Sequence, residues 1–330
     1  MQNNMVDEII NTDKENLLED TTFIVDIDDK NTRIDKYLSD ELADVSRSRI
    51  QKLLDEGMIT VNNNKVKSNY KVAADDIINV HIPELVVPEI VPEDISLDIV
   101  YEDNDIIVIN KPKGMVVHPA AGHYSGTLVN ALMYHCRDNL SGINGVLRPG
   151  IVHRIDMNTT GVIVACKNDY AHNFIAQQLS VHSITRKYYA IVHNQFNNTE
   201  GVVDAPIGRN PSDRKKMAVD KKNGKRAVTH YRVLEQFGKF SYIECQLETG
   251  RTHQIRVHMA SIGHPLLGDD VYGSGKSPFN LCGQTLHAGV LGFIHPTTKE
   301  YVEYSADLPE YFQKVISRLR NSQVILYRSR

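Results

Sequence analysis

Cysteine is scarce in this chain of 330 residues. Its four cysteines, Cys136, Cys166, Cys245 and Cys282, lie far apart and form no Cys-x-x-Cys pair. This spacing argues against a zinc ribbon and against a framework of disulfide bonds, so we expect a protein of the reducing cytoplasm. No His-Glu-x-x-His motif occurs among the 14 histidines, and we predict no metal site.

Long apolar runs and targeting signals are also missing. No apolar stretch follows a basic N-terminal start, so the sequence predicts no signal peptide. No stretch approaches the roughly 20 apolar residues that span a bilayer, and we expect no association with membranes. The sequence also lacks a glycine-rich phosphate loop, which argues against a nucleotide cofactor.

Acidic residues slightly outnumber basic residues, but they are unevenly distributed. The net charge is −4, and the first 30 residues hold nine acidic and two basic side chains. The other 300 residues therefore carry a net charge of +3. Residues 1–20 are typical of an acidic, disordered tail. Because 41% of all residues are apolar, the remainder can fold as one large domain and one small domain.

Residues 21–82 predict a small domain of two helices followed by short strands. Thr32 can cap the first helix, and the second helix should follow Ser46, bury one apolar face and end at Gly57. This arrangement resembles the RNA-binding domain named after ribosomal protein S-four, and the resemblance implies RNA contact by the outward bases. A solvated helix surface is the alternative. Residues 83–93, with three prolines, predict an extended linker. The outward bases are Arg47, Arg49 and Lys52.

The most informative motif lies between residues 151 and 161. Apolar β-branched residues flank a polar loop, and two buried strands would hold the carboxylate of Asp156 in place. From spacing alone, a cap or turn residue is the commoner interpretation. The sequence His-Arg-Ile-Asp-x-x-Thr-Thr-Gly closely resembles the catalytic loop of RNA pseudouridine synthases of the Rlu family. Within that family the resemblance is to the RluA, RluC and RluD group, and most of all to RluD. That loop is usually His-Arg-Leu-Asp-x-x-Thr-Ser-Gly, so Ile155 and Thr160 are conservative departures.

Two further segments carry the same resemblance. Residues 185–192 read as a strand, and the family pattern basic-Tyr-x-Ala implies that Tyr188 projects into the active site. Tyr189 should then face the other way, although packing roles for both are the alternative. Residues 247–259 read as a strand that turns into a helix, with Arg251 at the corner. Its fork can pair with a carboxylate, and the matching family arginine pairs with the catalytic aspartate.

The large domain also offers candidate phosphate contacts. Residues 209–226 carry eight bases against two acids and contain turn residues. They predict a loop or loose hairpin that contacts phosphates without reading sequence, although a solvated basic loop is the alternative. Lys111, which begins a Lys-Pro-x-Gly turn after a buried strand, should be structural and support the Asp156 loop. The RNA-binding candidates in this domain are Arg154, Arg209, Arg214, Lys215 and Lys216.

We therefore predict an α+β chain. The small α/β domain precedes a pseudouridine synthase fold over residues 94–330, in which helices flank a long, mostly antiparallel sheet. The resemblance implies isomerisation of uridine to pseudouridine in RNA without a cofactor, by Asp156, Arg251 and Tyr188. Whether Asp156 attacks the ribose, attacks the uracil or takes a ribose proton stays open.

The order of the domains indicates the substrate. It resembles Rlu members that modify large-subunit ribosomal RNA, so we expect that RNA as partner, free or within a pre-ribosomal particle. A transfer RNA enzyme and a non-catalytic ribosome-associated factor are the alternatives. A glycosidase with two carboxylates would need a second acid that no motif supplies. We expect a cytoplasmic monomer.

Overall fold

The chain divides between Val87 and Pro88 into two compact units, which we call the N-terminal unit and the C-terminal unit. No helix of the described part of the chain is long and apolar enough to cross a membrane. Residues 1–16 of the predicted tail and residues 84–89 of the predicted linker lie outside the described residues. The computed structural model describes residues 17–42, 45–83, 90–120, 122–137, 139–143, 148–213, 216–274 and 277–328.

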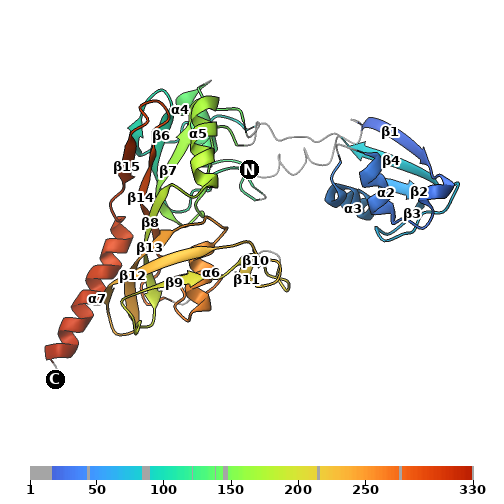
Figure 1. The fold of residues 1–330 in the computed structure, drawn as a ribbon. Helices are drawn as coiled ribbons and strands as arrows, with labels where there is room; N and C mark the ends of the chain where they lie inside the picture. The colour runs from blue at the N-terminus through green and yellow to red at the C-terminus, as the bar shows by residue number, and fades with distance from the viewer. Residues whose placement is uncertain are drawn as a thin grey trace, which may run out of the picture. The chain divides into compact units, whose positions relative to one another are not determined.

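The N-terminal unit combines a four-stranded antiparallel sheet, in the order β1-β4-β2-β3, with two α-helices (Figure 1). As predicted, the second helix follows Ser46, whose side chain caps it by accepting a bond from the Arg49 N–H. Gly57 ends that helix with a φ of 79°, a conformation that glycine adopts without strain. The predicted cap of the first helix by Thr32 is wrong, because Arg33 occupies the N-cap position and makes no side-chain cap bond. The elements are β1 (Leu17–Ile24), the 3₁₀ helix η1 (Ile27–Asp29), α2 (Ile34–Glu41), α3 (Arg47–Glu56), β2 (Ile59–Val61), β3 (Asn64–Lys65) and β4 (Ile77–Pro83).

The predicted tail of residues 1–20 extends too far at its C-terminal end. Strand β1 begins at Leu17, four residues before the predicted start of the small domain, and pairs along its length with β4. The acidic residues that suggested a tail therefore continue into the strand. An edge strand can carry them because it has a hydrogen-bonded neighbour on only one side.

The C-terminal unit is built on a nine-stranded sheet. Its strands are β5 (Ile99–Glu102), β6 (Ile106–Lys111), β7 (Thr160–Cys166), β8 (Thr185–His193), β9 (Glu200–Asp204), β12 (Val228–Gln236), β13 (Phe240–Leu247), β14 (Leu286–Ile294) and β15 (Tyr301–Ser305). The other elements are α4 (Leu128–Cys136), α5 (Asp169–Ser180), β10 (Ile207–Arg209), β11 (Met217–Val219), α6 (Gln254–Ser261) and α7 (Glu310–Arg328).

The large sheet is mostly antiparallel, as predicted. Its order is β5-β6-β7-β14-β8-β13-β12-β9, and β15 pairs with β14. Among the described strand pairs only β7 and β14 run parallel, and they pair over just two positions. The centre of the sheet is therefore a short contact between two strands that are far apart in sequence, and the candidate active site lies beside it.

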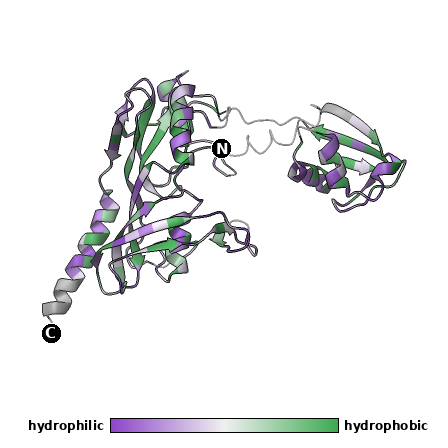
Figure 2. Cartoon of the chain, in the orientation of Figure 1, coloured by the Kyte–Doolittle hydropathy of each residue, from purple (hydrophilic) through white to green (hydrophobic). Residues whose placement is uncertain are grey.

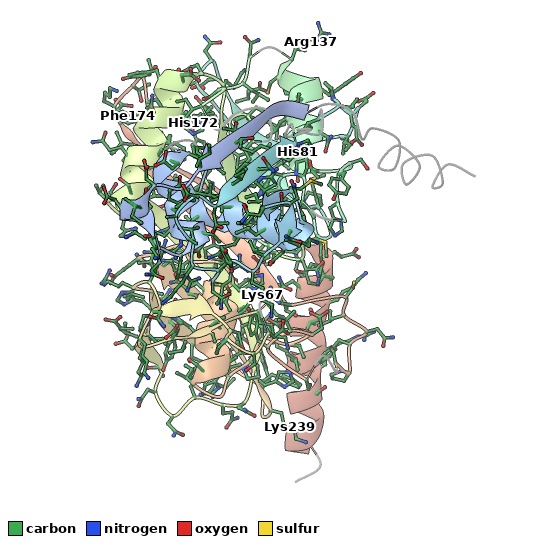
Figure 3. The ribbon with its side chains drawn as sticks, turned by 90° about the vertical axis from the view of Figure 1, so that its right-hand side faces the viewer. Lys67, His81, Arg137, His172, Phe174 and Lys239 are labelled. Atoms are coloured by element: carbon green, nitrogen blue, oxygen red, sulfur yellow. The ribbon has the colours of Figure 1, made fainter. Side chains whose placement is uncertain are left out.

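Helices cover both faces of the sheet. Hydrophobic residues concentrate on its strands (Figure 2). Along β6, Ile107 and Ile109 pack with α4, whereas Ile106 and Val108 pack with α5. This division follows from the alternation of side chains along a strand. Helix α5 presents buried His172 and, beside it, Phe174, whose ring lies under the ammonium group of Lys299 (Figure 3).

Candidate active site

The Asp156 loop is fixed at the edge of β7. Its first residues take the place of a neighbouring strand: Ile151 bridges to Ala165, and the ring of His153 accepts a hydrogen bond from the Val164 N–H (3.1 Å). This bond requires an unprotonated Nε2, so the neutral ring carries its proton on Nδ1. Burial, together with the nearby Arg186, lowers the pKa of His153 to about 3.

Lys111 holds the far side of the same loop, which is the supporting role predicted for it. The side chain is fully buried, and its Nζ donates to the carbonyl oxygens of Pro112, Met115 and Met157 at 2.8, 2.8 and 3.0 Å. Burial lowers its pKa to about 7, against the opposing effect of Asp156. Because an ammonium group has three donors, three carbonyls satisfy it completely. The residue after Asp156 is thereby fixed to the sheet.

Gly161 lets β7 approach β14 at the centre of the sheet. Its φ is 108°, and a Cβ atom there would lie 2.1 Å from the carbonyl oxygen of Ala288. Next to it, the Thr160 hydroxyl lies 2.8 Å from Nδ1 of His287. Only glycine fits this close contact, which brings the Asp156 loop next to β14 and β8.

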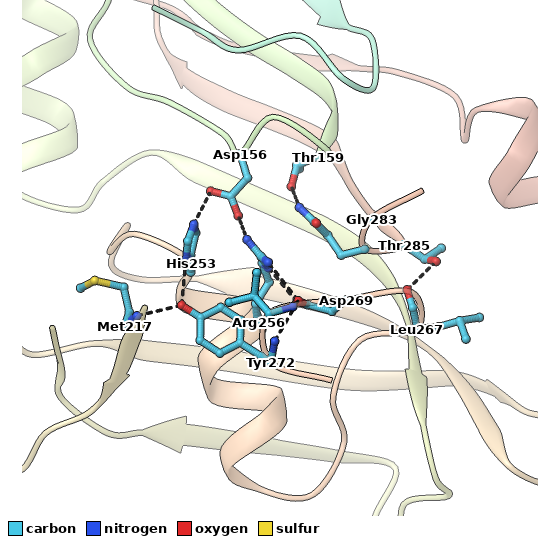
Figure 4. A network of polar contacts seen from close by, with 12 residues as sticks. Asp156, Thr159, Met217, His253, Arg256, Leu267, Asp269, Tyr272, Gly283 and Thr285 are labelled. Carbon is cyan, nitrogen blue, oxygen red and sulfur yellow. Dashed lines mark hydrogen bonds and ion pairs between the residues drawn. The ribbon is translucent and has the colours of Figure 1, made fainter. Parts of the chain in front are cut away.

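Arg256 is the partner of Asp156 (Figure 4). Its Nη1 donates to Oδ2 of Asp156 at 3.0 Å, and its Nε and Nη2 donate to the two oxygens of Asp269 at 2.7 and 2.9 Å. Asp269 also accepts the backbone N–H groups of Val271 and Tyr272. Burial lowers the pKa of Arg256, but the two carboxylates outweigh it and raise that pKa above its ordinary value. Asp269 thus holds the buried guanidinium group through two nitrogens and orients the third towards Asp156.

The predicted pairing of Arg251 with Asp156 is therefore wrong. Arg251 does stand at the corner between β13 and α6, but its Nε donates to the carbonyl oxygen of Arg226 at 2.9 Å. Its backbone N–H donates to the side chain of Gln254, which also bonds Thr249 and so fixes the start of α6. The corner directs Arg251 away from the carboxylate, whereas the buried helix one turn later faces it.

His253 approaches the other oxygen of Asp156. Its Nε2 lies 3.8 Å from Oδ1, too far for a hydrogen bond, and its Nδ1 lies 2.7 Å from the hydroxyl of Tyr272. That hydroxyl also accepts the Met217 N–H at 2.9 Å (Figure 4). Burial lowers the pKa of His253, which favours the neutral ring. Among the described residues, Oδ1 of Asp156 consequently has no close cation and is the more available of the two oxygens.

Tyr188 lies in the same pocket as Asp156, and Tyr189 packs on the opposite side of the sheet against Tyr242. Burial raises the pKa of Tyr188, so its hydroxyl is neutral at pH 7. The volume of the pocket is about 50 Å³, room for a few water molecules. The lining residues are Arg154, Ile155, Asp156, Thr159, Tyr188, Leu247, Arg251, His253, Gln254, Ile255, Arg256 and Leu286. Asp156 is the single carboxylate among them.

Sequence reasoning did not find three members of this site: His253, Arg256 and Asp269. Arg256 and His253 lie in the same motif as Arg251, so the motif located the site without distinguishing the roles. Asp269 lies outside that motif, in the segment Gly-His-Pro-Leu-Leu-Gly-Asp of residues 263–269. The available signal was an aspartate 13 residues after an arginine of the motif. That spacing alone does not show that Asp269 pairs with Arg256, because the pairing depends on the fold.

The predicted RNA-binding residues occupy different environments. Arg47 is held by two bonds to the buried Asp35 carboxylate, and Lys52 lies 3.5 Å from Glu56. Arg49 on α3 is half-buried, and exposed Arg154 lines the pocket. The basic stretch contains the hairpin β10–β11, as predicted. Within it, Arg209 ends β10 and Lys216 lies 3.9 Å from Asp213, whereas Arg214 and Lys215 lie outside the described residues.

One group in the described part of the chain has the composition of a cation site: Asp103, Asp105 and His295. Its atoms already bond one another and the chain. Asp103 accepts two backbone N–H groups and lies 2.8 Å from Nε2 of His295, while Nδ1 of His295 accepts the N–H of Thr297. These contacts describe a structural cluster that ties the β5–β6 turn to the segment after β14.

Comparison with protein families agrees with this geometry. A sequence model of the RNA pseudouridylate synthase family matches residues 105–261, and a model of the S4 domain matches residues 32–78. The chain is 54% identical to YlyB, an uncharacterized RNA pseudouridine synthase of Bacillus subtilis, over 89% of this chain and 96% of that one. It is 47% identical to ribosomal large subunit pseudouridine synthase D of Zymomonas mobilis, over 87% and 93% respectively.

Solved structures resemble about two thirds of this chain. Human RNA pseudouridylate synthase domain containing 4 is 28% identical with a TM-score of 0.53, covering 67% of this chain and 92% of its own. Human RNA pseudouridylate synthase domain containing 1 is 26% identical with a TM-score of 0.51, covering 68% and 95%. The predicted fold is thereby confirmed.

Proposed function

Because the chain belongs to the RNA pseudouridine synthase family, we propose that it converts specific uridines of large-subunit ribosomal RNA to pseudouridine. The observation that carries the proposal is the single carboxylate of Asp156, held by a buried Arg256–Asp269 pair in a pocket with Tyr188. An isomerisation gains and loses no atoms, so one positioned carboxylate can serve both the breaking and the forming bond.

The reaction breaks the bond between the ribose and the uracil nitrogen, turns the uracil and joins its carbon-5 to the ribose. Asp156 either attacks the nucleoside or takes a ribose proton, and Oδ1 is our choice for the reacting oxygen. Arg256 occupies Oδ2 at 3.0 Å, while His253 stays 3.8 Å from Oδ1. A neutral His253 would leave the basicity of Oδ1 intact and still line the approach to it.

Tyr188 forms the apolar wall against which the base turns. The residue is 8% exposed, and burial raises the pKa of its hydroxyl. A neutral phenol can stack on uracil and stays in place while the base is free. Transfer of the carbon-5 proton by its hydroxyl is the alternative role. The target nucleotide must leave its stack to reach this pocket, which costs a few kcal/mol.

Two features support ribosomal RNA as the substrate. Relatives named ribosomal large subunit pseudouridine synthase D, from Zymomonas mobilis and from Neisseria meningitidis, are 47% and 43% identical over most of the chain. The S4 domain gives the enzyme a second surface for structured RNA. We propose that it acts as a cytoplasmic monomer on this RNA, free or in a pre-ribosomal particle. Transfer RNA is the competing substrate.

The test is to map pseudouridine in cells that lack the gene and in cells that carry wild type or Asp156→Asn. Carbodiimide-stop sequencing of ribosomal and transfer RNA reads both substrate classes at once. We expect sites in large-subunit ribosomal RNA to disappear in the deletion and to return with wild type but not with Asp156→Asn. Loss confined to transfer RNA would refute the substrate, and full rescue by Asp156→Asn would refute the assignment of the carboxylate.

A further inference from the structure

A second cavity adjoins the Asp156 pocket. Its volume is about 580 Å³, and it shares Arg154, Tyr188, Leu247 and Arg251 with the smaller pocket. Tyr188 therefore stands between the two spaces. A ligand group in the larger cavity would be the immediate neighbour of whatever occupies the pocket of Asp156.

The charge of this second cavity is one-sided. Its twelve lining residues include three arginines, Arg154, Arg186 and Arg251, and no aspartate or glutamate. Within the described residues, none of the three forms an ion pair with a carboxylate, unlike Arg256 of the neighbouring pocket. Three cations in a cavity that no aspartate or glutamate lines create a positive potential that attracts an anion.

Arg186 is the unusual member of this set. Its side chain is 7% exposed, and Nη2 donates to the backbone carbonyl of Glu248 at 2.9 Å. Its Nε is buried and finds no acceptor in the described part of the chain. Gly250 makes room for the guanidinium, since a Cβ there would lie 2.5 Å from Nη1. A buried cation with an unused donor is costly unless a ligand completes its hydrogen bonds.

We propose that the second cavity is a phosphate subsite that binds the phosphodiester next to the target uridine, with Arg186 as its buried anchor. The proposal deepens the proposed function and rests on it for the identity of the ligand as RNA. The uridine lies on the Asp156 side of Tyr188, and the neighbouring phosphate lies on the Arg186 side. Arg154 and Arg251, which line both spaces, contact the linkage between the two. The subsite thus fixes the backbone while the base is free to turn.

The decisive experiment neutralises one phosphate at a time. The substrate is a synthetic stem-loop around a uridine identified by the mapping above, with a methylphosphonate at each linkage near the target. For wild type, one adjacent methylphosphonate should raise KM about tenfold or more, as expected for the loss of a charged hydrogen bond, with little change in kcat. Equal effects at all linkages, or none at the adjacent ones, would overturn the proposal.

The variant Arg186→Met supplies the other half of a double-mutant cycle. It should raise KM for the native stem-loop by a similar factor and respond no further to the critical methylphosphonate. Because Arg186 has no carboxylate partner among the described residues, its replacement leaves no buried charge unpaired, and we expect the fold to survive. Lys187→Met, one residue along β8 on the opposite face, is the matched control and should retain full sensitivity. Additive effects in the cycle would contradict the assignment of Arg186.

A direct binding measurement separates this proposal from the proposed function. The NMR signal of the Arg186 Nε–H, identified by its loss in Arg186→Met, is followed during titration of the full chain. Uridine 3′-monophosphate and uridine 5′-monophosphate should shift it, and uridine should not. A shift in a protein that makes no pseudouridine would keep the anion site and refute only the activity. The same response to uridine as to the monophosphates, or none to either monophosphate, would refute the subsite.

Discussion

At the scale of single residues, Arg256 and Arg251 should respond differently to substitution. Arg256 bridges Asp156 and Asp269 with one fork, and a lysine has a single ammonium group that cannot hold both. Arg256→Lys should therefore slow the single-turnover rate by about a hundredfold, the typical cost of a misplaced reacting group. Arg251→Lys should mainly raise KM, because this side chain lines the cavities and does not bond the carboxylate. Single-turnover rates at saturating RNA decide the matter, and the reverse order would contradict the geometry.

The sequence assigned to Arg251 the role that Arg256 has in the structure, and this error shows what spacing can predict within a motif. The segment located the strand, the corner and the helix, and it placed Tyr188 and Tyr189 on opposite faces. It did not predict which arginine reaches Asp156, because both are compatible with one motif. The choice depends on Gln254, which fixes the start of α6, and on Asp269, which holds the guanidinium from the other side. Asp269 lies 13 residues from Arg256, and their contact exists only once the fold has formed.

His153 should give the protein a dependence on acid that can be measured. The folded chain needs an unprotonated Nε2 to accept the Val164 N–H, and the pKa is lowered to about 3 from its ordinary value near 6.5. The unfolded chain thus binds a proton that the folded chain does not, between those two values. The free energy of unfolding falls as the pH drops from about 6.5 towards 3, and this contribution is fully present above 6.5.

The variant His153→Gln offers an acceptor at a similar reach but does not titrate. Its urea-unfolding free energy should fall less steeply than that of wild type between pH 6.5 and the onset of acid unfolding. His123→Gln, at an exposed position, is the control and should keep the wild-type slope. If His153→Gln and wild type have parallel curves, the histidine does not act through its protonation.

At the scale of elements, the contact between β7 and β14 should be the least tolerant position of the sheet. Gly161→Ala places a Cβ 2.1 Å from the Ala288 carbonyl oxygen at a φ of 108°. Overpacking and backbone strain together should cost about 2–5 kcal/mol in the free energy of unfolding. Gly238→Ala is the control, because its φ of 67° is also positive but its Cβ would meet nothing within 4 Å. A similar loss in both variants by urea unfolding would mean that the close contact is unimportant.

Local sequence patterns predicted most of these strands and helices. Which strands pair with one another became known only from the structure. Runs such as Ile106–Ile109 alternate between two cores, which explains why they read as a buried strand. The parallel contact of β7 with β14 joins residues 127 positions apart, and no local signal specifies it. The start of β1 was missed for a related reason: its acidic residues resemble a disordered tail until β4 pairs with them.

At the scale of the whole molecule, the question is what the N-terminal unit adds to a catalytic unit that holds every residue of the Asp156 pocket. The candidate RNA-binding side chains of this unit differ in how tightly neighbouring acids hold them. Arg47 is held by the buried Asp35, whose pKa is lowered by Arg47, Arg33 and Gln51 against the effect of burial. Arg49 is half-buried and Lys52 is exposed on α3, and within the described residues the only acid that pairs with either is Glu56, beside Lys52. These two side chains can release bound counterions when they meet RNA phosphates.

We therefore expect the double variant Arg49→Gln/Lys52→Gln to weaken binding of structured ribosomal RNA and to flatten its salt dependence. Each lost phosphate contact should lower the slope of log affinity against log salt by about 1. The single-turnover rate on a saturating short stem-loop should stay at the wild-type value, because the Asp156 pocket lies entirely in the C-terminal unit. Lys67→Gln removes an exposed charge outside α3 and serves as the control (Figure 3). Filter binding at several salt concentrations measures the slopes. An unchanged slope in the double variant would remove α3 from the RNA interface, and a slower reaction at saturation would mean that this unit acts on chemistry as well as on binding.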